Sequence, residues 1–203
     1  MFSGIVEATG VITFIETIYD CLHVRILPQI NFSDLQIGDS VAVNGVCLTV
    51  TTLIDNEFTA TIVPETLRLT NLKKLSLNEK VNLERSAKLD TRIGGHNVQG
   101  HVDGEGEIID LQSDGESALI AKIQVPDTIN KYIVKKGYVT IDGMSITVMD
   151  VAPEWFTATF IPHTQEVTVT NQYRKGTCVN IEVDILGKYI EKLLGAQKQC
   201  DHI

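Results

Sequence analysis

An internal repeat constrains the fold of this chain more than any other feature of its sequence. The stretch NGVCLTV at 44–50 recurs as DGMSITV at 142–148, and FTATIVPET at 58–66 recurs as FTATFIPHT at 156–164. VNLE at 81–84 recurs as VNIE at 179–182, and GIVEATG at 4–10 matches GHVDGEG at 100–106. The matches keep their order, with an offset of 98 that becomes 96 near the start. The chain is therefore expected to contain two copies of one domain.

Each copy has the residue pattern of an all-β domain. Runs of β-branched residues are interrupted by Asn44-Gly45 in the first copy and by Asp142-Gly143 in the second, and such dipeptides favour tight hairpins. Short strands with regular turns predict a small closed barrel, because closure leaves no exposed sheet edge. At ~5 residues a strand, about six strands fit into each copy.

The chain divides into three predicted parts: a first barrel at 1–94, a second barrel at 95–185, and a C-terminal helix and tail at 186–203. Gly94-Gly95 marks the junction between the barrels. After the second copy, four apolar residues recur at the spacing of an amphipathic helix: Tyr189, Ile190, Leu193 and Leu194. This apolar stripe would lie either on a barrel of its own chain or against the same helix in other subunits. Its terminal position outside the repeat favours the second arrangement.

Charge and composition limit the partners and the compartment. The chain has 17 basic and 26 acidic residues and a net charge of -9, so neither nucleic acid nor an anionic membrane is expected as main partner. The N-terminus has no basic leader or cleavage site, and no stretch approaches the ~18 apolar residues that span a bilayer. A cytoplasmic location is expected. Four cysteines without disulfide-like spacing are predicted to be reduced thiols: Cys21, Cys47, Cys178 and Cys200.

Positions that differ between the copies are candidates for separate tasks. Four pairs stand out: Cys47 and Ser145, Ile5 and His101, Glu65 and His163, and Ser86 and Asp184. Cys47 is either a buried structural thiol or a nucleophile or proton donor. His101 could move protons near neutral pH, whereas His96 is interpreted as a turn residue. Asp184 is either a helix cap or a catalytic group.

Three matched pairs of threonines reflect either β propensity or hydrogen bonding to a polar heterocycle. They are Thr49 and Thr147, Thr61 and Thr159, and Thr66 and Thr164. HExxH, CxxC and dinucleotide-binding patterns are absent from the sequence, so neither a metal nor a cofactor is expected. Two similar pockets imply two similar ligands, which an enzyme would bring together so that proximity lowers the barrier.

Several motifs together resemble the riboflavin synthase family from Met1 to about Leu194. They are MFSGIVEATG, NGVCLTV, PETLRLTNL, IGGHNVQGHVDG, KKGYVTIDGMSITV and VNIEVD. The resemblance implies two homologous six-stranded Greek-key barrels and a C-terminal helix. It also implies a homotrimer, joined largely through those helices, with each active site between the first barrel of one subunit and the second barrel of its neighbour.

The activity implied by the resemblance is that of a transferase that dismutates 6,7-dimethyl-8-(D-ribityl)lumazine. One substrate molecule gives a four-carbon unit to the other, and the products are riboflavin and 5-amino-6-(D-ribitylamino)uracil. The family uses no cofactor and no metal. The resemblance leaves open an association with lumazine synthase, which some relatives form.

The resemblance also implies the site residues. Five are catalytic candidates: Cys47, His101, Ser145, Thr147 and Asp184. By hypothesis, Ser145, Thr147 and His101 assist loss of the 7-methyl proton from the second-barrel substrate, while Cys47 and Asp184 serve the acceptor. Binding positions assigned to the first barrel are Gly4, Ile5, Val6, Cys47, Leu48, Thr49, Thr61, Ile62, Val63, Pro64, Glu65 and Thr66. Those assigned to the second are Gly100, His101, Val102, Lys136, Ser145, Ile146, Thr147, Thr159, Phe160, Ile161, Pro162, His163 and Thr164.

Two positions depart from the family pattern: Ser3, where threonine is usual, and His163, where glutamate is frequent. The alternative function is that of a non-catalytic antenna-type protein, which keeps the fold and holds a lumazine or flavin without turnover. Such relatives typically lose second-barrel motifs and stay monomeric. This chain keeps GGHNVQGH, DGMSITV and the terminal helix, which favours the enzyme. A flavin reductase-like protein would need a Rossmann-like module, whose pattern the sequence lacks.

Overall fold

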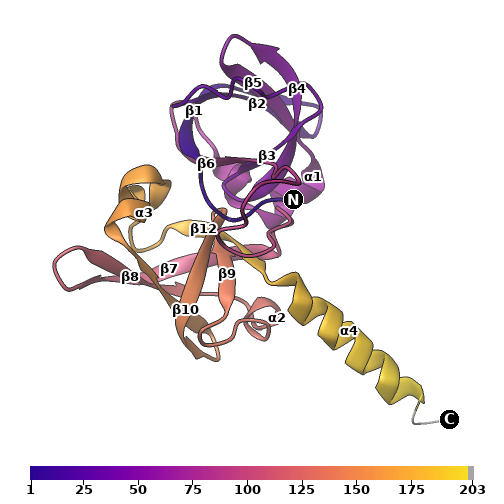
Figure 1. Ribbon diagram of the computed structural model, residues 1–203, viewed down its shortest axis with the longest axis vertical. Helices are drawn as coiled ribbons and strands as arrows, with labels where there is room; N and C mark the ends of the chain where they lie inside the picture. The colour runs from indigo at the N-terminus through magenta and orange to yellow at the C-terminus, as the bar shows by residue number, and fades with distance from the viewer. Residues whose placement is uncertain (201–203) are drawn as a thin grey trace.

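A computed structural model describes residues 1–200 of the chain, with side chains up to residue 195, and contains two tandem β-barrels followed by a helix (Figure 1). The first barrel consists of β1 (Ala8–Ile18), β2 (Cys21–Pro28), β3 (Ser40–Val43), β4 (Val46–Ile54), β5 (Glu57–Ile62) and β6 (Lys80–Arg85). The second consists of β7 (Gly104–Asp114), β8 (Ala118–Gln124), β9 (Tyr138–Ile141), β10 (Met144–Ala152), β11 (Trp155–Phe160) and β12 (Cys178–Val183). The helices are α1 (Pro64–Leu69), η1 (Asn71–Lys74), α2 (Asp127–Asn130), α3 (Pro162–Val167), η2 (Val169–Gln172) and α4 (Ile185–Cys200).

The two barrels share one topology. Around the first, the strand order is β1-β2-β5-β4-β3-β6, and around the second it is β7-β8-β11-β10-β9-β12; every pair is antiparallel and both sheets are closed. Each barrel is filled by its own cluster of inward-facing aliphatic and aromatic side chains, including Phe58 in the first and Phe156 in the second. The prediction of two all-β barrels with six strands each is therefore confirmed.

The predicted hairpin turns lie where the two barrels meet. Asn44-Gly45 has φ angles of 45° and 78°, and Asp142-Gly143 has φ angles of 44° and 85°, as the tight hairpin turn requires. A Cβ atom added to Gly45 would lie 2.5 Å from the backbone nitrogen of Gly143. Glycine is thus needed here both for its backbone conformation and for the close approach of the opposite barrel.

Reciprocal hydrogen bonds join the barrels around these turns. The Asn82 side-chain amide donates to the carbonyl of Asp142 (2.9 Å), and the Asn180 side-chain amide donates to the carbonyl of Asn44 (2.8 Å). Each amide oxygen also accepts a backbone N–H from the opposite barrel, at 2.9 and 2.7 Å. Matched residues of the repeat therefore exchange equivalent bonds, which makes the contact between the barrels approximately two-fold symmetric.

Asp142 breaks this symmetry, because Asn44 occupies the matched position. The Asp142 carboxylate accepts hydrogen bonds from the backbone of Asn180 (2.7 Å), the amide of Asn71 (3.1 Å) and the hydroxyl of Tyr173 (2.7 Å). Burial outweighs these bonds and raises the pKa of Asp142 to about 7. Burial also raises the pKa of Tyr173 well above its ordinary value.

Asp142→Asn is expected to flatten the pH dependence of stability. The native pKa of this carboxyl is raised, so the folded state binds more protons than the unfolded state between about pH 4 and 7, and the free energy of unfolding falls as pH rises through that window. The free energy of unfolding of the variant, relative to that of the wild type, should therefore be ~2–4 kcal/mol higher at pH 8 than at pH 4. Urea unfolding at both pH values measures this, with the exposed turn variant Asp55→Asn as control. A parallel pH dependence in wild type and D142N would contradict the expectation.

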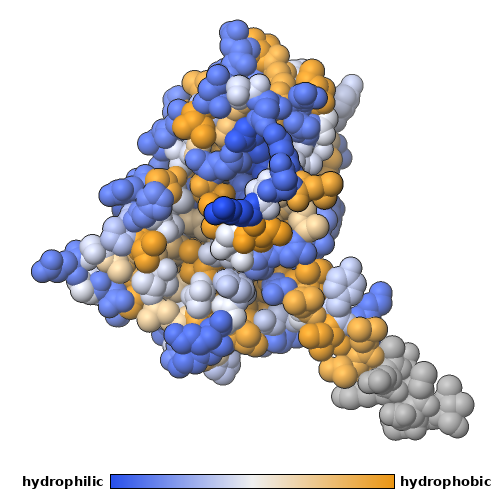
Figure 2. Space-filling model, in the orientation of Figure 1, coloured by the Kyte–Doolittle hydropathy of each residue, from blue (hydrophilic) through white to orange (hydrophobic). Residues whose placement is uncertain are grey.

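Helix α4 extends away from the barrels, and its apolar side chains are exposed (Figures 1 and 2). Between 54% and 68% of the surface is exposed in each of Leu186, Tyr189, Ile190, Leu193 and Leu194. The helix is anchored at its base, where Tyr132 contacts Gly187 and Glu191. The predicted helix is confirmed. The arrangement in which its stripe lies on a barrel of its own chain is wrong.

Candidate active site

Two short segments, residues 2–6 and 98–102, cross between the barrels. Phe2 and Val98 form a backbone bridge where the segments meet, with hydrogen bonds of 2.7 and 3.1 Å. Val6 then packs against the core of the second barrel, and Val102 packs against the core of the first. Each barrel is therefore completed by a segment from the other half of the chain, and the predicted boundary at 94–95 lies just before the second crossing segment.

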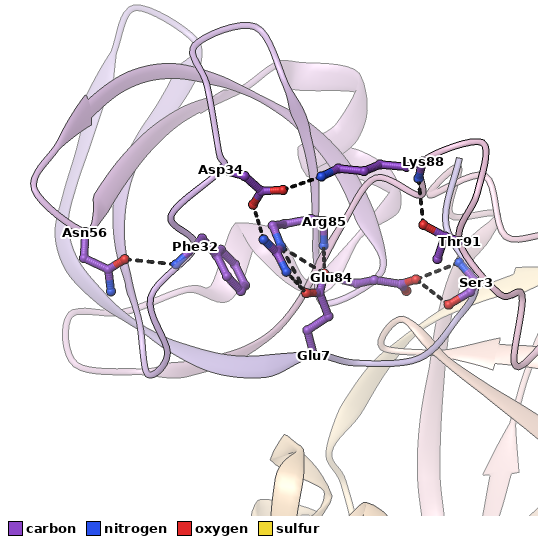
Figure 3. A network of polar contacts seen from close by, with 9 residues as sticks. All are labelled: Ser3, Glu7, Phe32, Asp34, Asn56, Glu84, Arg85, Lys88 and Thr91. Atoms are coloured by element: carbon purple, nitrogen blue, oxygen red, sulfur yellow. Dashed lines mark hydrogen bonds and ion pairs between the residues drawn. The ribbon is translucent and has the colours of Figure 1, made fainter.

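Two buried carboxylates position the crossing segments. Glu84, on β6, accepts the backbone N–H groups of Ser3 (2.6 Å) and Gly4 (3.1 Å) and the hydroxyl of Ser3 (2.8 Å) (Figure 3). Glu182, the matched residue on β12, accepts the N–H groups of residues 99–101 at 2.7 to 3.0 Å. Burial raises the pKa of both glutamates, while these hydrogen bonds act in the opposite direction. The glutamates fix the direction in which the carbonyls of each segment point.

Arg85 holds the exit of the first segment. Its guanidinium pairs with the carboxylates of Glu7 and Asp34 and lies 4.7 Å from the ring centre of Phe32 (Figure 3). Lys88, just after the barrel, donates to Asp34 at 2.7 Å. This network ties the first crossing segment to the start of the linker between the barrels.

Cys47 and Ser145 occupy equivalent places against the crossing segments. The backbone nitrogen of Ser145 donates to the carbonyl of Gly4 (2.8 Å), and that of Cys47 donates to the carbonyl of Gly100 (2.9 Å). Both glycines have φ near +75°, and an added Cβ would lie 2.5 Å from the Cβ of Ser145 or 2.6 Å from that of Cys47. The two matched but different side chains thus have the same backbone setting and differ in their surroundings.

Cys47 faces a cavity of about 140 Å³ on the first barrel. The cavity is lined by Val46, Cys47, Glu65, Thr66, Leu69, Thr70, Gly100, His101 and Val102. Within one chain, His101 therefore lies with Cys47 on the first barrel, and not beside Ser145, with which the hypothesis from the sequence groups it. Residues 100–102 line this cavity of the first barrel, whereas Gly4 and Val6 contact the second barrel. The sequence predicts each segment at the barrel of its own half, because the crossing leaves no trace in the repeat.

Ser145 is instead paired with His96. The serine Oγ lies 2.7 Å from His96 Nδ1, and His96 Nε2 lies 3.4 Å from Oγ1 of Thr140. The imidazole is buried and stacks on the ring of Tyr138 with a centroid distance of 5.2 Å and an interplanar angle of 9°. Burial lowers the pKa of His96, and the nearby Asp184 carboxylate acts in the opposite direction. This arrangement keeps a neutral imidazole in contact with a serine hydroxyl.

The role of His96 cannot be found by comparing matched positions of the repeat. With an offset of 96, this histidine would match a position before Met1. Gly95 beside it touches Ser145 so closely that an added Cβ would lie 2.5 Å from the serine Cβ. The Gly-Gly-His stretch is therefore a feature of the second barrel alone.

Lys136 has a strained backbone that its counterpart avoids. Its φ is +67°, in the left-handed region, where the matched residue of the first copy is Gly38 with φ of +95°. A side chain costs ~1–2 kcal/mol in that conformation. Such strain is typical of residues whose side chains have a function.

The other predicted site residues have varied surroundings. The Oδ1 atom of Asp184 accepts the N–H of Leu186 at 3.0 Å, so Asp184 caps helix α4. Thr61 Oγ1 lies 3.2 Å from His23 Nδ1. Thr49, Thr147, Glu65 and His163 are exposed, as are Val63 and Ile161. Leu48, Ile62 and Phe160 are core residues, so a ligand could reach only their backbone.

Three further findings concern the described part of the chain. No group of three or more His, Cys, Asp or Glu side chains among these residues could hold a metal ion. No helix within residues 1–200 is long and apolar enough to cross a membrane. Cys21, Cys47 and Cys178 are free thiols, whereas the side chain of Cys200 lies outside the described residues.

Comparison with known proteins matches both halves of the chain to one family. The profile of the lumazine binding domain matches residues 3–86 and again residues 99–184. Riboflavin synthase of Mycobacterium tuberculosis (strain H37Rv) is 43% identical over 198 residues, which cover 96% of this chain and 98% of that protein. The chain belongs to the riboflavin synthase family. Riboflavin synthase of Schizosaccharomyces pombe is 44% identical over 198 residues, which cover 97% of this chain and 95% of that protein.

Solved structures support the fold of this riboflavin synthase family member. LumP complexed with riboflavin superimposes with a TM-score of 0.84, and the alignment covers 91% of this chain and all of LumP. LumP complexed with 6,7-dimethyl-8-(1'-D-ribityl) lumazine superimposes with a TM-score of 0.82. Sequence identity to both is 23%, so the likeness establishes the double-barrel fold and no more.

Proposed function

We propose that this chain catalyses the riboflavin synthase reaction, the dismutation of two 6,7-dimethyl-8-(D-ribityl)lumazine molecules into riboflavin and 5-amino-6-(D-ribitylamino)uracil. The observation that carries the proposal is the equivalent placement of two different reactive groups, Ser145 beside a neutral histidine and Cys47 beside a cavity. Two copies of one substrate need two similar sites. The donor and the acceptor need different chemistry, which the difference between the sites provides.

The second barrel is suited to activating the donor. The 7-methyl group of the lumazine is acidic, because its carbanion is delocalised into the ring carbonyls. As the methyl proton moves to Oγ of Ser145, the hydroxyl proton of Ser145 moves to Nδ1 of His96, at 2.7 Å, and an imidazolium forms. The electron pair of the broken C–H bond stays on the substrate. Thr147, exposed on the same strand, and Lys136 supply contacts to the ring and to the developing negative charge.

The first barrel is suited to activating the acceptor. Cys47 faces the cavity as a half-buried thiol and serves as the nucleophile that adds to the ring of the acceptor substrate. His101 lines the same cavity and is the candidate for taking the thiol proton. Asp184 of a neighbouring subunit serves the acceptor from the other side. The predicted binding segments around Thr61 and Thr66 hold the ring and the ribityl chain.

The complete site is proposed to form between subunits of a homotrimer. The exposed stripe on α4, and the absence of a covering surface for it among the described residues, support association through this helix. In the trimer, the first barrel of one chain would face the second barrel of its neighbour and bring donor and acceptor together. The cytoplasmic location and an association with lumazine synthase stay predictions.

Turnover with the lumazine as sole substrate tests the proposed function. Purified protein in EDTA, without cofactor, should form riboflavin, seen in its visible absorption band, and an equal amount of the pyrimidine. Light scattering of the same sample should give the mass of three chains. Tight lumazine binding without either product would contradict the enzyme and favour the antenna-type alternative.

A further inference from the structure

We propose that Thr140 and Tyr138, both on β9, are positioning residues that set the tautomer and the ring plane of His96, so that the Nδ1 lone pair points at Ser145. This inference rests on the proposed function, because it assigns the support of the base used there. Neither residue is among the site residues predicted from the sequence.

The register of the β9–β10 pair places Thr140 and Tyr138 next to the residues of the proposed donor site. In the β9–β10 pair, Thr140 lies directly opposite Ser145, and Tyr138 lies opposite Thr147. Directly opposed residues of an antiparallel pair have Cβ atoms about 5 Å apart on the same face of the sheet. His96, from the linker, lies over this face and contacts Ser145 through one ring nitrogen and Thr140 through the other. The arrangement is a row of hydroxyl, imidazole and hydroxyl.

The distances indicate which nitrogen carries the proton. A neutral imidazole has one donor and one acceptor nitrogen. The contact of 2.7 Å between Ser145 and Nδ1 is short, as is typical of a hydroxyl donor, whereas the 3.4 Å contact between Nε2 and Thr140 is long. We therefore assign the hydrogen to Nε2, which donates weakly to Thr140, and the lone pair to Nδ1, which accepts from Ser145.

Thr140 matters most when His96 becomes charged. The imidazolium formed by proton transfer carries N–H groups on both nitrogens. Thr140 is 1% exposed, and no other acceptor for Nε2–H is found among the described residues. Without the Thr140 hydroxyl, this buried N–H would lack a partner, and the imidazolium would be destabilised. The neutral ring would then favour the tautomer with hydrogen on Nδ1, which cannot accept the serine proton.

Tyr138 fixes the ring plane. Its ring is nearly parallel to that of His96, so rotation of the imidazole away from Ser145 would break the stacking. In the first barrel, Ser40 stands in place of Tyr138 and Ala42 in place of Thr140, so the aromatic ring is missing at the first position and the hydroxyl at the second. The supporting pair is therefore present only in the barrel that holds His96.

Nitrogen NMR of the full-length protein with ¹⁵N-labelled histidine tests the assignment directly. The His96 signals are identified by their loss in His96→Gln. Wild type and Thr140→Ser should show hydrogen on Nε2, and Thr140→Val should show it on Nδ1. Hydrogen on Nδ1 in the wild type, or on Nε2 in T140V, would overturn the inference. Should T140V fail to fold, Thr140→Ala, which copies Ala42, replaces it.

Kinetics separate positioning from a general structural role. T140V should lower kcat about 10- to 100-fold with KM within about twofold, and T140S should restore most of kcat. An equal loss in T140S and T140V would overturn the positioning role, as would unchanged kcat in both. Because the NMR readout needs no turnover, a failure of the proposed function would appear separately, as a wild-type protein that makes no riboflavin.

Discussion

His96→Gln is expected to lower kcat by about two to three orders of magnitude while KM changes only a few-fold. Glutamine can still hydrogen-bond to Ser145, but its amide cannot accept a proton at neutral pH. The binding surface stays the same, and the step that needs a base is lost. Steady-state formation of riboflavin measures the effect.

Exchange of the 7-methyl protons with deuterated solvent distinguishes this base from the acceptor chemistry. Enzyme-catalysed exchange should fall in H96Q together with riboflavin formation. In Cys47→Ala, exchange should continue while riboflavin formation falls, because the thiol acts on the other substrate molecule. Full exchange in H96Q would remove His96 from the proton-transfer step.

The pH profile provides a second readout for the same residue. Burial lowers the pKa of His96 from its ordinary value of about 6.5, so the neutral, active form persists to lower pH. The acidic limb of kcat/KM in the wild type should accordingly lie below pH 6.5, and H96Q should lose that limb.

Gly143→Ala is expected to destabilise the protein strongly, because this turn combines a left-handed backbone with a close neighbour from the opposite barrel. With φ of +85°, an L-residue costs ~1–2 kcal/mol. The new methyl group would also lie 2.9 Å from the backbone nitrogen of Gly45 and 3.1 Å from its Cα. Because the reciprocal Asn82 and Asn180 bonds hold that backbone, overpacking should add a further ~1–3 kcal/mol.

Gly176→Ala is the matched control for this substitution. Gly176 lies in the same barrel with φ of +88°, and an added Cβ would meet nothing within 4 Å. The G176A variant should therefore lose only the free energy of unfolding that comes from the left-handed backbone conformation. Chemical denaturation of both variants measures the difference, and equal losses would mean that the contact between the turns adds nothing to stability.

The architecture could be predicted from the sequence because its causes are local and repeated. An Asn-Gly or Asp-Gly dipeptide between two β-branched runs favours a hairpin through the backbone conformation of its own two residues. Two copies of one pattern in the same order imply two barrels. The helical spacing after the second copy was also enough to predict α4. What covers the stripe of α4 depends on other molecules, and no single-chain pattern encodes it.

The site could be predicted only in part. Cys47 and Ser145 were found because they differ within a shared frame. The crossing segments that contact them were each expected at the other barrel. Contact of Gly100 with Cys47 and of Gly4 with Ser145 is decided by how the barrels pack and not by spacing along the chain. His96 was interpreted as a turn residue because it has no counterpart in the other copy. Thr140 was overlooked because a buried threonine in a strand is ordinary.

The crossing of residues 2–6 and 98–102 has a consequence for how this gene can change. A substitution in residues 2–6 acts at the Ser145 site of the second barrel, and a substitution in residues 98–102 acts at the Cys47 site of the first. The sequences of the two halves therefore cannot change independently of each other. In a scan of all substitutions, defects at the Ser145 site should map in part to the first few codons, and defects at the Cys47 site to codons near the middle. In such a map, defects at the site of one half would appear at codons of the other half. Compensating changes should pair positions such as 4 with 145 and 47 with 100, which are in contact although they are far apart in the gene.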